Sequence, residues 1–281
     1  MEMRKRAVRR ERAAATDRGR WDEAAARLVT QRRSLAPIEA LPEPLRPRDE
    51  AEGYALQQAA QRVLEAAGLG PVVGHKIGCT TAVMQAFLGI PNPCGGTIHA
   101  AGVLRSGARV PRSRFVRLGV ECEIAVALGR DLVPGDAPVD GESAAAAVRA
   151  VMPAIEIVDD RYRDYRTLGV PTLVADDFFH SGCVLGEPIA DWRALDLAAL
   201  AGATFIDGAE AGRGTGASVM GHPLAALAWL ANARPAFGLE PLREGQFVLL
   251  GSLVQTVWVE ARMQARIEIE RLGTLELGVD P

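Results

Sequence analysis

The segment at residues 116–129 carries the clearest alternating hydrophobic pattern of the chain. Side chains of a strand point alternately to its two faces, so every second residue shares a face. One face of this segment is wholly apolar: Val120, Cys122, Ile124, Val126 and Leu128. The opposite face has small apolar residues and two carboxylates, Glu121 and Glu123. The pattern predicts a strand that is buried on both faces.

Two acids on such a strand need an explanation. Glu121 and Glu123 would lie about 7 Å apart along the strand, where they repel each other and are costly to desolvate. A bound cation would remove both penalties, so we interpret the pair as a candidate metal site. The alternative is that this face of the strand is in contact with solvent.

The same spacing occurs a second time, at Glu268 and Glu270. These two acids alternate with isoleucines and lie next to Arg266 and Arg271. That setting is typical of the solvated face of an edge hairpin. The spacing of the acids alone is therefore weak evidence for a metal, and the apolar surroundings of the first pair are the stronger observation.

Helical periodicity dominates the start of the chain. It predicts helices at residues 21–33 and 49–67, joined by a connector at 36–47 that carries four prolines. Asp49 and Glu52 have the spacing of a capping box at the start of the second helix. Residues 1–20 are basic and lack the apolar core of a secretory signal, and their acids argue against a transit peptide. We expect this leader to be disordered.

The remaining elements alternate irregularly between helix and strand. Strands are expected at residues 72–78, 116–129, 153–160, 247–250, 254–260, 264–270 and 274–277, with an apolar strand ending at 186, and helices at 81–88, 142–152, 191–201 and 223–233. Parallel β-α-β alternation is not sustained, which favours an α+β fold. We expect one structural unit, in which a helical part at 21–70 packs on a mixed-sheet domain at 71–281.

Composition excludes several classes of function. The chain of 281 residues is 48% hydrophobic, has a net charge of −3 and contains only 5% aromatic residues, so it does not resemble a nucleic-acid-binding protein. No apolar run reaches the roughly 18 residues that a membrane span requires. The glycine-rich segment 209–221 lacks the spacing of a dinucleotide-binding loop. Four cysteines fit no zinc motif, so we expect reduced thiols. We also expect a cytoplasmic location and a homo-oligomer.

Two further polar residues interrupt apolar strands. Glu156 lies in the strand at 153–160, about thirty residues after the first acidic pair. Lys76 lies in the strand at 72–78, between Gly74 and Gly78. A lysine in such a strand either snorkels to solvent at an edge or serves a buried anionic group.

Taken together, these residues resemble the fumarylacetoacetate hydrolase superfamily, and more narrowly its branch of 2-keto-4-pentenoate hydratases and 4-oxalocrotonate decarboxylases. The resemblance rests on the order and spacing of several blocks between residues 21 and 277. They are the three acids, the block Gly-His-Lys-Ile-Gly-Cys-Thr around Lys76, the segment at 51–59, the strand at 153–159 with Arg161, the block at 221–232 and the block at 245–252.

The resemblance implies a layered, rolled mixed β-sheet with a helical N-terminal part. It also implies a Mg²⁺ or Mn²⁺ ion on Glu121, Glu123 and Glu156, and catalytic roles for Lys76 at the substrate and for Asp176. Oxygen ligands independently suit a hard cation. The chain departs from the family after Asp176, where Asp177, Phe178 and Phe179 replace residues that are often small and polar.

The function expected from the resemblance is hydration of a 2-hydroxy-2,4-dienoate to a 4-hydroxy-2-oxo acid. A decarboxylase of a 4-oxalocrotonate-like 2-oxo acid is the first alternative, because it uses the same metal and enolate chemistry. Hydrolysis of a C–C bond in an acylpyruvate is the second alternative. A protein that binds a metal or a 2-oxo acid without turnover is the third.

Overall fold

The computed structural model describes the backbone of residues 2–135 and 137–281, and the side chains from residue 18 onward apart from residue 136. The helices are α1 (Glu2–Ser34), α2 (Glu50–Leu64), α3 (Ala82–Leu88), α4 (Gly141–Ala147), α5 (Val170–Ala175) and α6 (Pro223–Ala233). The strands are β1 (Val72–Gly78), β2 (Cys94–His99), β3 (Val103–Arg105), β4 (Ala108–Pro111), β5 (Leu118–Leu128), β6 (Val148–Asp159), β7 (His180–Leu185), β8 (Ala201–Ile206), β9 (Ala209–Thr215), β10 (Phe247–Ser252), β11 (Val257–Trp258), β12 (Met263–Ile269) and β13 (Gly273–Asp280).

The larger sheet is rolled. Its strands follow the order β2-β1-β10-β5-β6-β7-β3, and β11 pairs with β5. The two ends of this order, β2 and β3, are joined by only three residues, Ala100–Gly102. The sheet must therefore curl until its ends meet, and a Cβ at Gly182 of β7 would lie only 2.9 Å from the carbonyl oxygen of Gly102.

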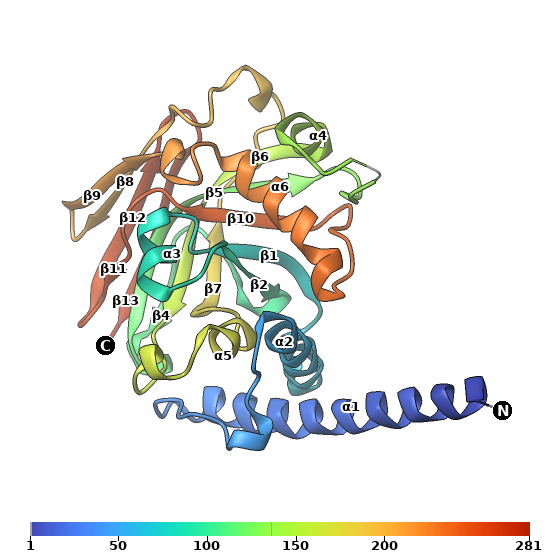
Figure 1. Ribbon diagram of the computed structural model, residues 1–281. Helices are drawn as coiled ribbons and strands as arrows, with labels where there is room; N and C mark the ends of the chain where they lie inside the picture. The colour runs from blue at the N-terminus through green and yellow to red at the C-terminus, as the bar shows by residue number, and fades with distance from the viewer. Residues whose placement is uncertain (1, 136) are drawn as a thin grey trace.

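A second sheet covers part of the outside of the roll (Figure 1). It has the order β4-β13-β12-β8-β9. The core between the sheets contains the predicted apolar face of β5 together with side chains such as Ile267 of β12 and Leu277 of β13. Ala125 and Ala127, on the other face of β5, pack inside the roll with Met152 and Leu249. The prediction that β5 is buried on both faces is therefore confirmed.

The N-terminal helices pack below the roll, where α1 contacts α2 and α2 contacts α5 (Figure 1). Asp49 caps α2 by accepting a hydrogen bond from the backbone nitrogen of Glu52, as predicted. The helix predicted from residue 21 is the C-terminal part of the longer α1. The backbone of residues 2–20 forms the first part of α1, in line with the helix propensity of its arginines, alanines and glutamates. The disorder expected for this leader stays a prediction. The side chains of residues 1–17 lie outside the described residues.

The α+β class and the rolled mixed sheet are confirmed, whereas several local predictions are wrong. The alanine-rich helix α4 ends at Ala147, because the following residues pair with β5 and form the first half of β6. The helix expected at 191–201 is a short 3₁₀ turn followed by β8. In each case long-range strand pairing overrides the local pattern.

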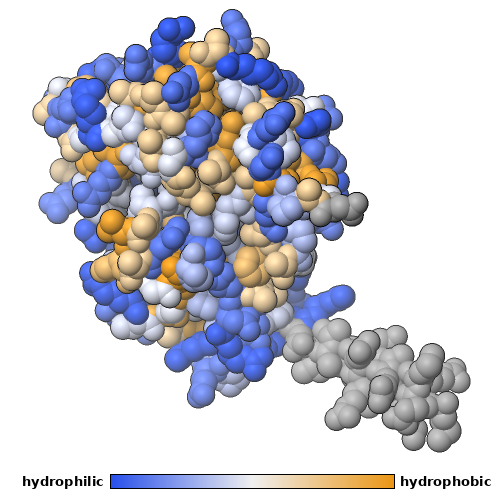
Figure 2. Space-filling model, turned by 45° about the horizontal axis from the view of Figure 1, so that its top comes forward, coloured by the Kyte–Doolittle hydropathy of each residue, from blue (hydrophilic) through white to orange (hydrophobic). Residues whose placement is uncertain are grey.

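None of the described helices is both long and apolar enough to cross a bilayer. On the face that Figure 2 shows, hydrophobic and hydrophilic side chains are interspersed. The four cysteines are free thiols, and three of them are buried.

Candidate active site

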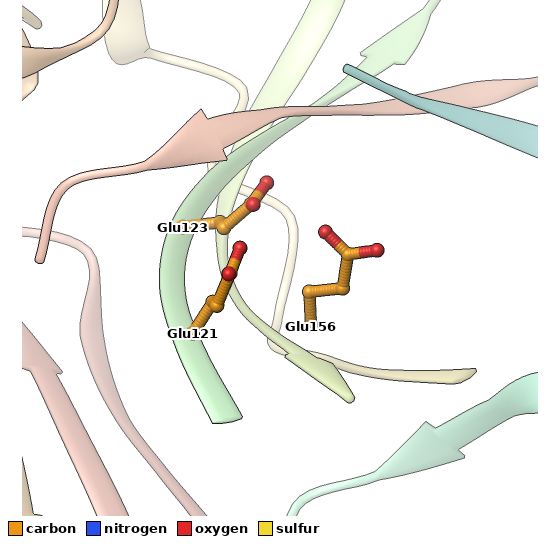
Figure 3. A group of neighbouring side chains, drawn as sticks. All are labelled: Glu121, Glu123 and Glu156. Atoms are coloured by element: carbon orange, nitrogen blue, oxygen red, sulfur yellow. The ribbon is translucent and has the colours of Figure 1, made fainter. Parts of the chain in front are cut away.

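Three carboxylates from two neighbouring strands meet inside the roll (Figure 3). The antiparallel pairing of β5 with β6 places Glu121 directly opposite Glu156, and Glu123 lies two residues further along the same face of β5. One oxygen atom from each carboxylate lies within 4.8 Å of the others. The structure thus brings together the three acids that the sequence analysis proposed as metal ligands.

Burial makes this cluster unfavourable without a cation. The Glu123 side chain is 0% exposed and that of Glu156 is 1% exposed. Desolvation and the nearby charge of Glu156 raise the pKa of Glu121 to about 7, and the same causes raise the pKa of Glu123 well above its usual value. The Oε1 atom of Glu123 has no hydrogen-bond partner among the described residues. An unpartnered buried oxygen in a cluster of three carboxylates fits a hard divalent cation.

Each carboxylate is also held by a group outside the cluster. The backbone nitrogen of Gly251 donates to Glu123 Oε2 over 2.9 Å, and the hydroxyl of Thr256 donates to Glu121. The Nδ1 atom of His180 lies 2.8 Å from Glu156 Oε1. Such contacts fix the orientation of metal ligands. Sequence reasoning missed these three residues, because they come from β10, the following loop and β7, and no local spacing relates them to the acids.

Lys76 lies beside the carboxylates and does not snorkel to solvent. Its side chain is buried, and its Nζ atom lies 3.4 Å from Glu156 Oε1. Nζ also donates a hydrogen bond of 2.6 Å to the backbone oxygen of Phe178. Burial alone would lower the pKa of Lys76, but the charges of Glu156, Glu121 and Glu123 outweigh it and raise that pKa. Lys76 is therefore a buried ammonium group within the acidic cluster.

One signal for Lys76 lay in the sequence itself. Lys5 is the only other lysine in a chain that otherwise uses arginine as its cation. An ammonium group is a compact point charge, whereas a guanidinium group is wide and planar. Space at this position is limited, since a Cβ at Gly96 would lie 3.2 Å from the Lys76 side chain. The site therefore suits lysine and not arginine.

Asp176 lies at the end of α5, in a buried network beside these residues. Its Oδ2 atom accepts hydrogen bonds from Arg161 Nε at 2.6 Å and from the Tyr162 hydroxyl at 2.8 Å. Its Oδ1 atom lies 3.5 Å from a guanidinium nitrogen of Arg32. These contacts describe a supporting residue, and the catalytic role expected for Asp176 stays a prediction.

Replacing Asp176 with asparagine is expected to destabilise the fold. The change leaves the buried guanidinium of Arg161 without its anionic partner, which costs about 3 kcal/mol or more. Urea denaturation of the variant measures this loss. Glu39→Gln is the matched control, because Glu39 pairs with Arg163 on the surface. A surface ion pair contributes about 1 kcal/mol or less to the free energy of unfolding. Equal stability of the two variants would contradict the structural role of Asp176.

The second acidic pair, Glu268 and Glu270, differs from the first in its exposure and in its contacts. Glu268 is paired with Arg266, and Glu270 is exposed. Both belong to the hairpin of β12 and β13 in the second sheet, so the predicted hairpin is confirmed. Its predicted edge position is wrong, because β8 and β4 flank the two strands.

The double variant Glu268→Gln with Glu270→Gln is therefore expected to bind Mn²⁺ as tightly as the unmodified protein and to turn over at a similar rate. Solvated carboxylates on another sheet contribute little to a buried site. Calorimetric titration with Mn²⁺ and a rate assay check both values. A large loss of metal affinity in this variant would show that the metal binds at the second sheet, and would refute its assignment to the rolled sheet.

The rolled sheet and its acidic cluster define a class of protein that comparisons with known proteins identify. The sequence model of the family "Fumarylacetoacetate (FAA) hydrolase C-terminal" matches residues 86–280. The chain belongs to this family.

Two curated relatives are close in sequence. The chain is 36% identical over 267 residues to a 2-keto-4-pentenoate hydratase of Paraburkholderia phymatum, covering 92% of this chain and 97% of the relative. It is 35% identical over 229 residues to a 2-hydroxyhexa-2,4-dienoate hydratase of Comamonas testosteroni, covering 80% of this chain and 84% of the relative.

A solved structure shares both the fold and the helical N-terminal part. The 4-oxalocrotonate decarboxylase of Pseudomonas putida G7, complexed with magnesium and adipate, superimposes with a TM-score of 0.86 at 25% identity. The match covers 93% of this chain and 98% of the decarboxylase. A fumarylpyruvate hydrolase of Pseudomonas aeruginosa, at 16% identity and a TM-score of 0.57, shares the fold alone.

Proposed function

We propose that this protein is a metal-dependent hydro-lyase that adds water to a 2-hydroxy-2,4-dienoate of the 2-keto-4-pentenoate type and forms a 4-hydroxy-2-oxo acid. The observation that carries the proposal is the buried cluster of Glu121, Glu123 and Glu156 beside the ammonium group of Lys76. Relatives of similar length with about 35% identity are hydratases of such dienoates, which agrees with this chemistry.

The three glutamates would hold the divalent cation, for which we propose Mg²⁺ or Mn²⁺. Bound there, the ion would supply a Lewis acid for the carboxylate and 2-oxygen of the substrate. Gly251, Thr256 and His180 keep the glutamates in their orientation through the contacts described above.

Lys76 is proposed to act on the substrate. In the first half of the reaction the dienol loses its hydroxyl proton and gains a proton at C5, which gives a conjugated 2-oxo-3-enoate. In the second half the hydroxyl of water adds at C4 and its proton at C3. Negative charge develops on the 2-oxygen in both halves, and a fixed ammonium group stabilises charge that appears only in the transition state.

The decarboxylase remains the second candidate, because the solved structure with a TM-score of 0.86 is a 4-oxalocrotonate decarboxylase. Both reactions pass through charge on the same 2-oxygen, so the acids and Lys76 serve either. The two differ in whether the substrate carries a second carboxylate that can leave as CO₂. The cytoplasmic location and the homo-oligomer expected from the sequence also stay predictions.

Product analysis separates the candidates. The purified protein with Mg²⁺ is supplied in turn with 2-hydroxypenta-2,4-dienoate, a 4-oxalocrotonate and an acylpyruvate, and the products are identified by nuclear magnetic resonance. Hydration keeps every carbon atom, decarboxylation releases CO₂, and hydrolysis divides the chain. We expect the first outcome with the dienoate. Rapid CO₂ release from the second substrate with no hydration of the first would establish the decarboxylase instead.

A further inference from the structure

A left-handed turn lies directly beside the acidic cluster. Asp177, Phe178 and Phe179 follow one another with φ angles of 57°, 49° and 69°. L-amino acids with a Cβ rarely adopt this conformation, and three in succession persist only where the surrounding structure holds them in place. The geometry of this turn therefore needs a local explanation.

The turn presents two groups to the site. The backbone oxygen of Phe178 accepts the hydrogen bond from Lys76 Nζ at 2.6 Å. His180, which follows the turn and begins β7, lies 2.8 Å from Glu156 Oε1. A shift of this turn would therefore move the anchor of the ammonium group and the support of one metal ligand at the same time.

The buried side chain of Asp177 makes three contacts. Its Oδ1 atom accepts hydrogen bonds from the backbone nitrogen of Thr97 at 3.0 Å and from the Thr97 hydroxyl at 2.8 Å. Its Oδ2 atom lies 3.1 Å from a guanidinium nitrogen of Arg32. A second nitrogen of the same guanidinium donates to the backbone oxygen of His180 at 3.0 Å. Arg32 thus bridges the beginning and the end of the turn.

Arg32 comes from a remote part of the chain. It lies in the last turn of α1, more than fifty residues before the region that the family model matches. Its side chain is only 14% exposed, whereas Arg27 on the same helix is 54% exposed and pairs with Glu23. The buried position of Arg32 shows that this end of α1 reaches the supporting network of the site.

We propose that Arg32 is a positioning residue of the active site: from the N-terminal helix it holds the left-handed turn that orients Lys76 and Glu156. The inference rests on the proposed function for its catalytic consequence, but not for its effect on the metal site. Two nitrogens of one guanidinium group contact Asp177 and the backbone oxygen of His180 at the same time, an arrangement that suits arginine better than lysine. The N-terminal helix then belongs to the catalytic unit.

The test compares Arg32→Ala and Arg32→Lys with Arg27→Ala as the matched control on the same helix. Mn²⁺ affinity is measured by calorimetry on metal-free protein, and kcat and KM are measured with the dienoate. We expect Arg32→Ala to lower kcat at least about 10-fold and to weaken Mn²⁺ binding several-fold, the scale of a lost supporting contact. Arg32→Lys should be intermediate, and Arg27→Ala should match the unmodified protein.

Chemical rescue distinguishes positioning from a general loss of fold. Millimolar methylguanidinium should restore part of the kcat and of the Mn²⁺ affinity of Arg32→Ala, and should leave Arg27→Ala unchanged. Asp177→Asn breaks the same contact from the side of the turn and should reproduce the losses without rescue. If Arg32→Ala does not fold, Arg32→Lys and Asp177→Asn decide the question.

Normal kcat and normal Mn²⁺ affinity in folded Arg32 and Asp177 variants would overturn the proposal. Failure of the unmodified protein to hydrate the dienoate is a different result, because it removes the proposed function alone. In that event the Mn²⁺ affinities still test the inference: an affinity that falls in Arg32→Ala and recovers with methylguanidinium supports it, and an unchanged affinity refutes it.

Discussion

Lys76→Met is expected to fold and bind Mn²⁺ but to lose about 10²-fold or more in kcat, the scale of one missing electrostatic donor. The Nζ atom lies 3.4 Å from Glu156 Oε1, so its charge lies beside the proposed metal ligands, where the substrate is proposed to bind. Methionine keeps most of the length of the side chain without the charge. Measurements of kcat, Mn²⁺ affinity and melting temperature on the same preparation separate loss of catalysis from loss of structure.

Lys5→Met is the matched control, because it removes the only other lysine of the chain. We expect its kcat and its Mn²⁺ affinity to equal those of the unmodified protein. Turnover of Lys76→Met at the normal rate would exclude Lys76 from the chemistry. Its buried contacts with Phe178 and Glu156 would then serve stability alone.

The second large effect concerns the metal. Treatment with a chelator is expected to abolish turnover, and added Mg²⁺ or Mn²⁺ should restore it. Glu123→Gln should weaken Mn²⁺ binding by more than about 10-fold while the protein remains folded, because the amide removes one anionic ligand. Among the described residues, Glu123 Oε1 has no hydrogen-bond donor and Oε2 accepts from the backbone nitrogen of Gly251, so few protein contacts are lost. Calorimetry measures the Mn²⁺ affinity, and circular dichroism checks that the variant is folded. Full activity in excess chelator would refute the metal site.

The strand that carries the site could be predicted from the sequence because its two faces have different compositions. The apolar face of β5 and the acidic face are each continuous over several residues, and both are buried. Glu156 could be placed near the first two acids only through the family resemblance. The register that sets it opposite Glu121 depends on pairing between β5 and β6, which no local pattern fixes.

Other parts of the site could not be predicted from a local sequence pattern. His180, Thr256 and Arg32 contact the acids or their supporting turn from segments far apart in sequence. The left-handed conformation of Phe178 and Phe179 could not be predicted, because neither residue favours a positive φ. The alanine-rich segment before β6 shows the same limit, since strand pairing decides where helix α4 ends.

The most direct test of the account follows the oxygen atom of water into the product. The metal-loaded protein is incubated with 2-hydroxypenta-2,4-dienoate in water enriched in ¹⁸O, and fragment masses locate the label. We predict a product that retains all five carbon atoms and carries ¹⁸O in its C4 hydroxyl, formed only when Mg²⁺ or Mn²⁺ is present. Consumption of the dienoate without label at C4, or label incorporation at C4 by protein freed of metal, would contradict the proposed function.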